Sequence, residues 1–124
     1  MSGIAVRYLV RDLEEAIAFY TKHLGFALKE QMGPAFAYVT RGELTVWLSS
    51  PLTSAAKPMP DGRKPEPGGW NRFVLEVDDL GVLVTTMKAA GATFRNEILS
   101  GPGGKQILLD DPSGNPIELF EPAK

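Results

Sequence analysis

The sequence predicts an α+β fold built from two copies of a β-α-β-β-β module. The tetrapeptide Val-x-Asp-Leu occurs at 10–13 and again at 77–80, a separation of 67 residues (77 − 10). Each copy follows a short strand-like run and opens a segment with helical spacing of its apolar residues. Three predicted strands, rather than one, follow each helix, which argues against both an all-β fold and a doubly wound fold.

The first module begins with a strand at 5–10, a run rich in β-branched and aromatic residues. Asp12 is the expected N-cap of the helix that follows, because two glutamates fill the first turn, where the helix dipole favours negative charge. Gly25 supplies the left-handed conformation that ends the helix. The remaining strands of this module are expected at 26–32, 36–40 and 44–49.

The second module repeats this order. We expect a strand at 72–77, a helix capped by Asp79 and ended by Gly91, and strands at 93–98, 105–109 and 116–120. The segment 111–115 has proline and glycine where a tight turn favours them. The run Gly101–Lys105 resembles a phosphate loop only superficially, since no helix follows it, and it is predicted to connect two strands.

The 124 residues fit a single domain, with module 1 at about 4–49, a linker at about 50–69 and module 2 at about 70–122. The linker is rich in proline and is long for a compact domain. It is either a flexible connector or a loop that borders a ligand site. Trp70 is expected to anchor its end.

Composition narrows the classes of function. Thirteen basic and fifteen acidic residues give a net charge of −2, which argues against a nucleic-acid or anionic-membrane partner. The absence of cysteine excludes disulfides, thiolate metal sites and a cysteine nucleophile. The N-terminal residues do not have the pattern of an export signal, and no apolar run is long enough to cross a membrane. We therefore expect a cytoplasmic protein.

The chain resembles the vicinal oxygen chelate superfamily, which is also called the glyoxalase/bleomycin-resistance/dioxygenase superfamily. The resemblance rests on Val10-Arg11-Asp12-Leu13, Ala18-Phe19-Tyr20, Leu24-Gly25-Phe26, Val77-Asp78-Asp79-Leu80 and Asp111-Pro112-Ser113-Gly114-Asn115-Pro116-Ile117-Glu118-Leu119. It implies paired βαβββ modules that form an open, cupped mixed sheet, usually in a homodimer. It also implies a small-molecule site inside the cup, where several members bind a divalent metal.

Strand alternation predicts which side chains face the cup, because successive side chains point to opposite faces. Apolar residues such as Tyr8, Leu75 and Leu119 should pack under the helices. The opposite parity assigns the ligand-binding candidates Arg7, Trp47, Arg72, Glu76, Glu118 and Phe120. Phe36 and Tyr38 extend the aromatic lining, although core packing explains these aromatics nearly as well.

The resemblance places metal ligands at the positions of Ala5, Trp47, Arg72 and Glu118. Only Glu118 has a side chain that can bind a cation, and a guanidinium repels one. A divalent ion usually needs three or four protein ligands. We therefore expect neither a metal nor another cofactor. His23 matches none of the four positions and is better explained as a charge partner for the end of the first helix.

Arg72 and Glu118 would form a polar pair in place of the metal. The guanidinium either pairs bidentately with Glu118 or binds a carboxylate, phosphate or enolate oxygen of a ligand. The alternative is that the two residues only neutralise each other in a filled cup.

Three functions remain open. The first is a metal-free dimer that binds a small molecule, drug sequestration included. The second is a glyoxalase-like lyase or isomerase in which Glu118 is the catalytic base and Arg72 stabilises the oxyanion of a small carbonyl substrate. The third is a structural or interaction protein whose cup is filled. The sequence leaves the question of catalysis undecided.

Overall fold

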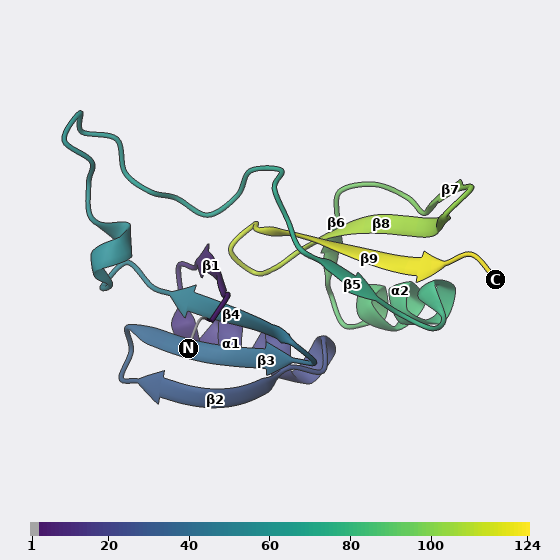
Figure 1. Cartoon of the computed structure of the whole chain (residues 1–124), viewed down its shortest axis with the longest axis horizontal. Coiled ribbons are helices and arrows are strands. Elements are labelled where there is room, and N and C mark those ends of the chain that lie inside the picture. Colours follow the sequence, from purple (N-terminus) through teal and green to yellow (C-terminus); the bar gives the residue numbers. More distant parts are fainter. Residues whose placement is uncertain (1–2) are drawn as a thin grey trace. The chain divides into compact units, whose positions relative to one another are not determined.

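A computed structural model of the protein describes residues 3–124. The chain forms two compact units, Met1–Gly68 and Gly69–Lys124. Each unit has one α-helix and one mixed sheet (Figure 1). Within the described residues, no helix is long and apolar enough to cross a membrane.

The first unit has a four-stranded sheet in the order β1-β4-β3-β2. Its strands are β1 (Val6–Leu9), β2 (Ala27–Met32), β3 (Phe36–Arg41) and β4 (Leu44–Ser49). β1 runs parallel to β4, and the other pairs are antiparallel. Helix α1 (Leu13–His23) packs on one face of the sheet, and the short 3₁₀ helix η1 (Ser54–Ala56) lies in the linker (Figure 1).

Helix α1 begins and ends where the sequence predicts. The Asp12 side chain accepts a hydrogen bond from the backbone N–H of Glu15 at 3.0 Å, which satisfies one of the free donors of the first turn. Gly25 has a φ of 69°, a conformation that L-residues with a side chain rarely adopt. The chain turns back at this glycine, and the Phe26 N–H donates to the Tyr20 carbonyl at 3.1 Å.

The second unit repeats the plan with a less regular sheet, in the order β5-β9-β8-β6 with β7 also paired to β8. Its elements are β5 (Val74–Glu76), α2 (Leu80–Ala89), β6 (Thr93–Phe94), β7 (Leu99–Gly101), β8 (Gly104–Asp110) and β9 (Pro116–Pro122). Asp79 caps α2 by accepting from the N–H of Val82 at 3.1 Å. Glu121 adds a second cap, since its carboxylate accepts from the N–H of Leu80 at 2.8 Å and joins the helix to β9.

One predicted strand is wrong in its second half. β6 covers only Thr93–Phe94, and β7 begins at Leu99. The side chain of Asn96 accepts the backbone N–H of Leu108 at 2.9 Å, so a side chain takes a donor that a continuous strand would have bonded through its backbone. Residues 101–105 connect β7 to β8, with Gly101 opposite Gly104, as predicted for a strand-connecting turn.

Burial agrees with the predicted alternation of the strands. Most of the residues predicted to pack are buried, among them Tyr8, Val46 and Leu48 in the first unit and Leu75, Ile117 and Leu119 in the second, whereas Val6, Phe73 and Val77 are half-buried. Most of their neighbours along each strand are half-buried or exposed, with Ser49 and Pro116 as buried exceptions near the strand ends. Each sheet therefore has one face packed on its helix, while the side chains of its opposite face remain accessible. That opposite face is called the open face of the unit below.

Candidate functional site

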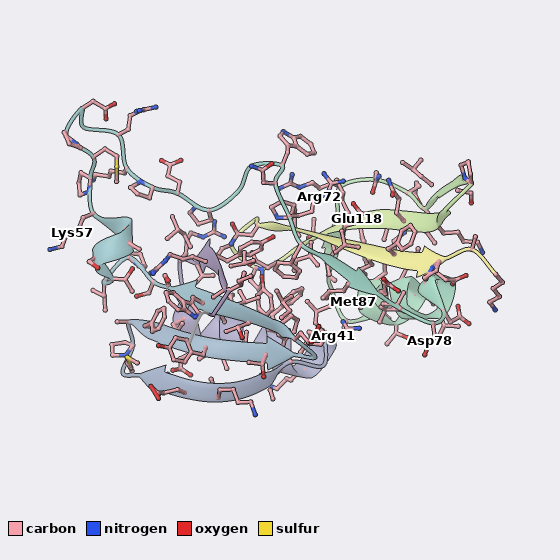
Figure 2. The ribbon with its side chains drawn as sticks, viewed as in Figure 1. Arg41, Lys57, Arg72, Asp78, Met87 and Glu118 are labelled. Atoms are coloured by element: carbon pink, nitrogen blue, oxygen red, sulfur yellow. The ribbon has the colours of Figure 1, made fainter. Side chains whose placement is uncertain are left out.

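An Arg72–Glu118 ion pair lies on the open face of the second unit (Figure 2). Arg72 precedes β5, and Glu118 lies in β9 opposite Val74 of β5. The guanidinium Nη2 and Nε atoms are 2.8 and 3.2 Å from Glu118 Oε1, and Nη1 donates to the Trp70 carbonyl at 3.2 Å. The side chains are 29% and 12% exposed, so solvent reaches both. The contact between these two residues was expected from the sequence.

The geometry of the pair differs from a bidentate fork. Both Arg72 donors go to a single carboxylate oxygen, Oε1. Glu118 Oε2 therefore has no hydrogen-bond donor among the described residues, and two of the five guanidinium N–H groups of Arg72 are also free. The pair offers a hydrogen-bond acceptor and hydrogen-bond donors to anything that reaches this face.

The rest of this open face is mixed in character. Glu76 and Phe120 lie opposite each other on β5 and β9, and Gln106 of β8 lies opposite Phe120. Glu76 is exposed, whereas Phe120 is half-buried. Both were ligand-binding candidates from the sequence, and the sheet register places them in the row next to Glu118.

Arg95 performs a structural task that the sequence did not reveal. Its guanidinium is 2.6 Å from Asp110 Oδ1 and donates to the carbonyls of Gly69 and Gly114 at 2.7 and 3.0 Å. It also lies 4.6 Å from the centre of the Trp70 ring. Arg95 thus connects the segment before β5 to the turn before β9. The Trp70 ring contacts this cation on one side, and its side chain remains 67% exposed.

The open face of the first unit has a different chemistry. Phe36, Tyr38 and Trp47 form a mutual cluster with ring centres 5.0, 5.7 and 5.6 Å apart. Arg7 of β1 lies opposite Trp47 of β4, with its guanidinium carbon 5.0 Å from the Trp47 ring and 5.8 Å from the Phe36 ring. We call Arg7 and these three aromatic residues the Arg7 cluster.

Ser49 holds the guanidinium of the Arg7 cluster in place. Arg7 Nη1 donates to Ser49 Oγ at 3.2 Å. Sequence reasoning missed Ser49, although it lies two residues after Trp47 and so shares its face. None of the ion pairs formed by residues 3–124 includes Arg7.

The four positions that the resemblance connects with a metal do not fit one. Ala5 has no donor atom, Trp47 is engaged with aromatic rings, and the Arg72 guanidinium lies against the only carboxylate of the set, Glu118. Residues 3–124 contain no group of three or more His, Cys, Asp or Glu side chains placed to hold an ion. His23 lies elsewhere, at the end of α1, with its ring centre 5.7 Å from that of Phe19.

Hollows of the surface do not by themselves identify the site. One of about 350 Å³ lies at the start of α1, lined by residues that include Arg11, Leu13 and Leu52. Another of about 270 Å³ lies beside the β7–β8 turn and includes Phe120. Neither of these two hollows is lined by a residue of the Arg72–Glu118 pair or of the Arg7 cluster.

Comparison with known proteins identifies the family. The model of the Glyoxalase/Bleomycin resistance protein/Dioxygenase superfamily matches residues 4–119. A search of curated proteins gave no significant match. Among solved structures, a member of this superfamily from Sphaerobacter thermophilus DSM 20745 is 28% identical with a TM-score of 0.73, over 98% of each chain.

Two further structures share the fold. An antibiotic-binding protein from Streptomyces sp. CB03234 is 24% identical with a TM-score of 0.70, again over 98% of each chain. A lactoylglutathione lyase from Agrobacterium tumefaciens is 21% identical with a TM-score of 0.71, over 98% of this chain and 94% of the other. One scaffold therefore accommodates both binding proteins and enzymes, and the residues of the open faces must distinguish between them.

Proposed function

Because the chain belongs to the Glyoxalase/Bleomycin resistance protein/Dioxygenase superfamily, we propose that it is a metal-free member that binds a small molecule through residues of an open sheet face. The observation that carries this proposal is the Arg72–Glu118 pair. It occupies two positions that the resemblance connects with metal ligands, and its cation would repel a divalent ion. The similarity in fold to an antibiotic-binding protein supports a role in sequestering a ligand.

The pair is suited to recognising a ligand as well as to neutralising charge. Polar atoms of a partly exposed side chain that have no protein partner bond to water, and a ligand can take the place of that water. Here Glu118 Oε2 and two guanidinium N–H groups stay free, while the bonds to Trp70 and Glu118 Oε1 fix the orientation of the guanidinium. Such preorganisation lowers the entropy that a ligand loses on binding.

A second function is catalysis, and Glu118 Oε2 favours it. This free carboxylate oxygen can accept a proton from the carbon next to a carbonyl group, and an adjacent Arg72 N–H can then stabilise the oxyanion that forms. The protein would in that case be a glyoxalase-like lyase or isomerase. Replacing Glu118 with Gln should abolish turnover of a small carbonyl substrate, and turnover that survives the change rules out Glu118 as the base.

Metal analysis and a ligand screen test the main proposal. Elemental analysis of the purified protein should find no stoichiometric divalent metal, and an ion lost on Glu118→Gln would contradict the metal-free assignment. Thermal-shift screening against flat antibiotics and small carboxylates should reveal ligands. A ligand at one hundred times its Kd adds about 2.7 kcal/mol to the free energy of unfolding. A protein that responds to no compound would support the filled-cup alternative.

Variants of the pair then locate the ligand. Arg72→Met should weaken the binding of a compound that uses the free N–H groups by about tenfold, because a charge-assisted hydrogen bond is lost. Arg63→Met is the matched control, since Arg63 also forms an arginine–carboxylate pair, with Asp61, but in the linker with its side chain 84% exposed. Equal affinity in the wild type and Arg72→Met would remove Arg72 from the site.

The proposal includes a homodimer. Strand β2 is an edge strand with all six residues exposed, and edge strands are commonly covered in assemblies. Light scattering during size-exclusion chromatography should give about twice the 13.4 kDa mass of the chain. A monomer at micromolar concentration would refute the dimer and leave ligand binding to be judged separately.

A further inference from the structure

We infer that the ligand is a planar aromatic anion and that Arg7, rather than Arg72, binds its negative charge. The inference rests on the proposed small-molecule function and adds the class of ligand to it. It follows from a difference between the two guanidinium groups. Arg72 is compensated by Glu118 at 2.8 Å, whereas none of the ion pairs among residues 3–124 includes Arg7.

Glu118 already compensates the charge of Arg72 on the side of the guanidinium that a ligand can reach. A carboxylate placed on the free N–H groups of Arg72 would also approach Glu118, whose Oε2 atom has no donor of its own. Two carboxylates close together repel each other, so the attraction of the guanidinium is largely cancelled. A neutral group that both accepts and donates a hydrogen bond suits this pair better than an anion.

Arg7 carries a full charge in a fixed position. Its Nη1 atom is bonded to Ser49 Oγ at 3.2 Å, and its guanidinium carbon lies 5.0 Å from the Trp47 ring. These contacts use one of its five N–H groups, and the others have no partner among the described residues. The hydrogen bond and the ring contacts restrict the orientation of the guanidinium, so its remaining N–H groups are placed to bind an anion.

The surroundings of Arg7 select a flat partner. Phe36, Tyr38 and Trp47 are half-buried and contact one another, so they form a stiff aromatic surface beside the charge. Rings of a ligand can pack against the exposed parts of these side chains, while its carboxylate or phenolate takes the Arg7 N–H groups. A cationic ligand would meet the repulsion of Arg7 on this surface.

Two probes with the same ring system, one anionic and one neutral, show how much the negative charge of a ligand contributes to its binding. We would titrate the ¹⁵N-labelled protein with 2-naphthoate and with 2-naphthamide and follow the indole N–H signals of its two tryptophans, with Trp70→Phe used to assign them. The Trp47 signal should move with both probes, and naphthoate should bind about tenfold more tightly, as expected for a charge-assisted hydrogen bond. Raising the salt concentration should reduce this preference.

Substitutions test the role of Arg7. In Arg7→Met the affinities for naphthoate and naphthamide should be about equal, and the affinity for naphthamide should stay within about threefold of the wild-type value. Arg7→Lys should restore part of the preference for naphthoate. Arg63→Met makes the same change in net charge and should keep the preference of the wild type. A melting curve for each variant shows that it is folded.

The outcomes distinguish the inference from the proposed function. A preference that persists in Arg7→Met, or that disappears in Arg72→Met instead, overturns the inference. So does a wild-type protein that binds neither probe, or one in which only the Trp70 signal moves. If the ligand screen still yields a compound without a planar anion, the proposed function stands although the inference has failed. If the screen yields no compound at all, both have failed.

Discussion

The two units present open faces of opposite chemical character on the same plan of strands. The offset of 67 residues that aligns the repeated tetrapeptide places Val74 at the position of Arg7 (7 + 67) and Arg72 at the position of Ala5 (5 + 67). Trp47 and Glu118 correspond in register, since Arg7 lies opposite Trp47 and Val74 lies opposite Glu118. The arginine has thus moved by two residues along the strand, which keeps it on the same face.

This shift changes what each arginine does. In the first unit the guanidinium lies beside an indole ring and forms no ion pair with residues 3–124, and in the second it forms an ion pair with a carboxylate that compensates its charge. The second unit also uses Arg95 as a structural clamp. The comparison predicts that Arg95 contributes mainly to stability, whereas Arg7 contributes mainly to binding the charge of a ligand.

The largest effect is expected from Gly104→Ala, which tests how far the second unit depends on a close backbone fit. Gly104 has a φ of 144°, and a Cβ atom there would collide with the Glu121 carbonyl oxygen and lie 3.0 Å from the Ala123 nitrogen. Neither neighbour is a flexible side chain, so the backbone of β8 or β9 must shift. We expect a loss of about 2–4 kcal/mol in the free energy of unfolding, measured by urea denaturation.

Gly103→Ala is the matched control for this position. A Cβ atom at Gly103 would meet only Phe120 Cζ at 3.9 Å, an ordinary contact. Its free energy of unfolding should stay within about 1 kcal/mol of the wild type. Equal destabilisation by the two substitutions would show that the collision with Glu121 is not the cause.

A smaller effect is expected when the arginines themselves are compared. Arg95→Met removes the ion pair with Asp110 and two hydrogen bonds to backbone carbonyls, and it leaves the 21%-exposed Asp110 side chain without its cation. The cost should be about 1–3 kcal/mol. Arg7→Met removes one hydrogen bond and the ring contacts of an exposed side chain, so it should cost less than about 1 kcal/mol. Similar losses in the two variants, measured by urea denaturation, would refute the division of roles.

Much of this arrangement could be predicted from the sequence because it depends on alternation along strands. The repeat gave the order of elements, and parity placed Trp47 on one open face and Glu118 on the other. The contact of Arg72 with Glu118, 46 residues away, follows from the pairing of the first and last strands of a module.

Other features depend on distances that no pattern encodes. That both Arg72 donors meet one oxygen of Glu118 is a matter of side-chain geometry. Arg95 was overlooked because residues 93–98 were predicted to form a strand, whereas Asn96 interrupts the backbone pairing and Arg95 turns toward Gly69 and Gly114. Whether a carboxylate compensates the charge of an arginine depends on which side chains lie beside it in the fold.

The smallest effect is expected from Ser49→Ala, which tests whether the position of Arg7, and not only its charge, matters. The substitution removes the hydroxyl that accepts from Arg7 Nη1 and keeps the guanidinium. Ser49 is buried, but a methyl side chain fits the same space, so the free energy of unfolding should change by less than about 1 kcal/mol. Freed of this bond, the guanidinium becomes more mobile, and the preference for 2-naphthoate over 2-naphthamide should fall about two- to threefold. A preference equal to that of the wild type would mean that the aromatic rings alone hold Arg7, and a preference as low as in Arg7→Met would mean that Ser49 itself contacts the anion.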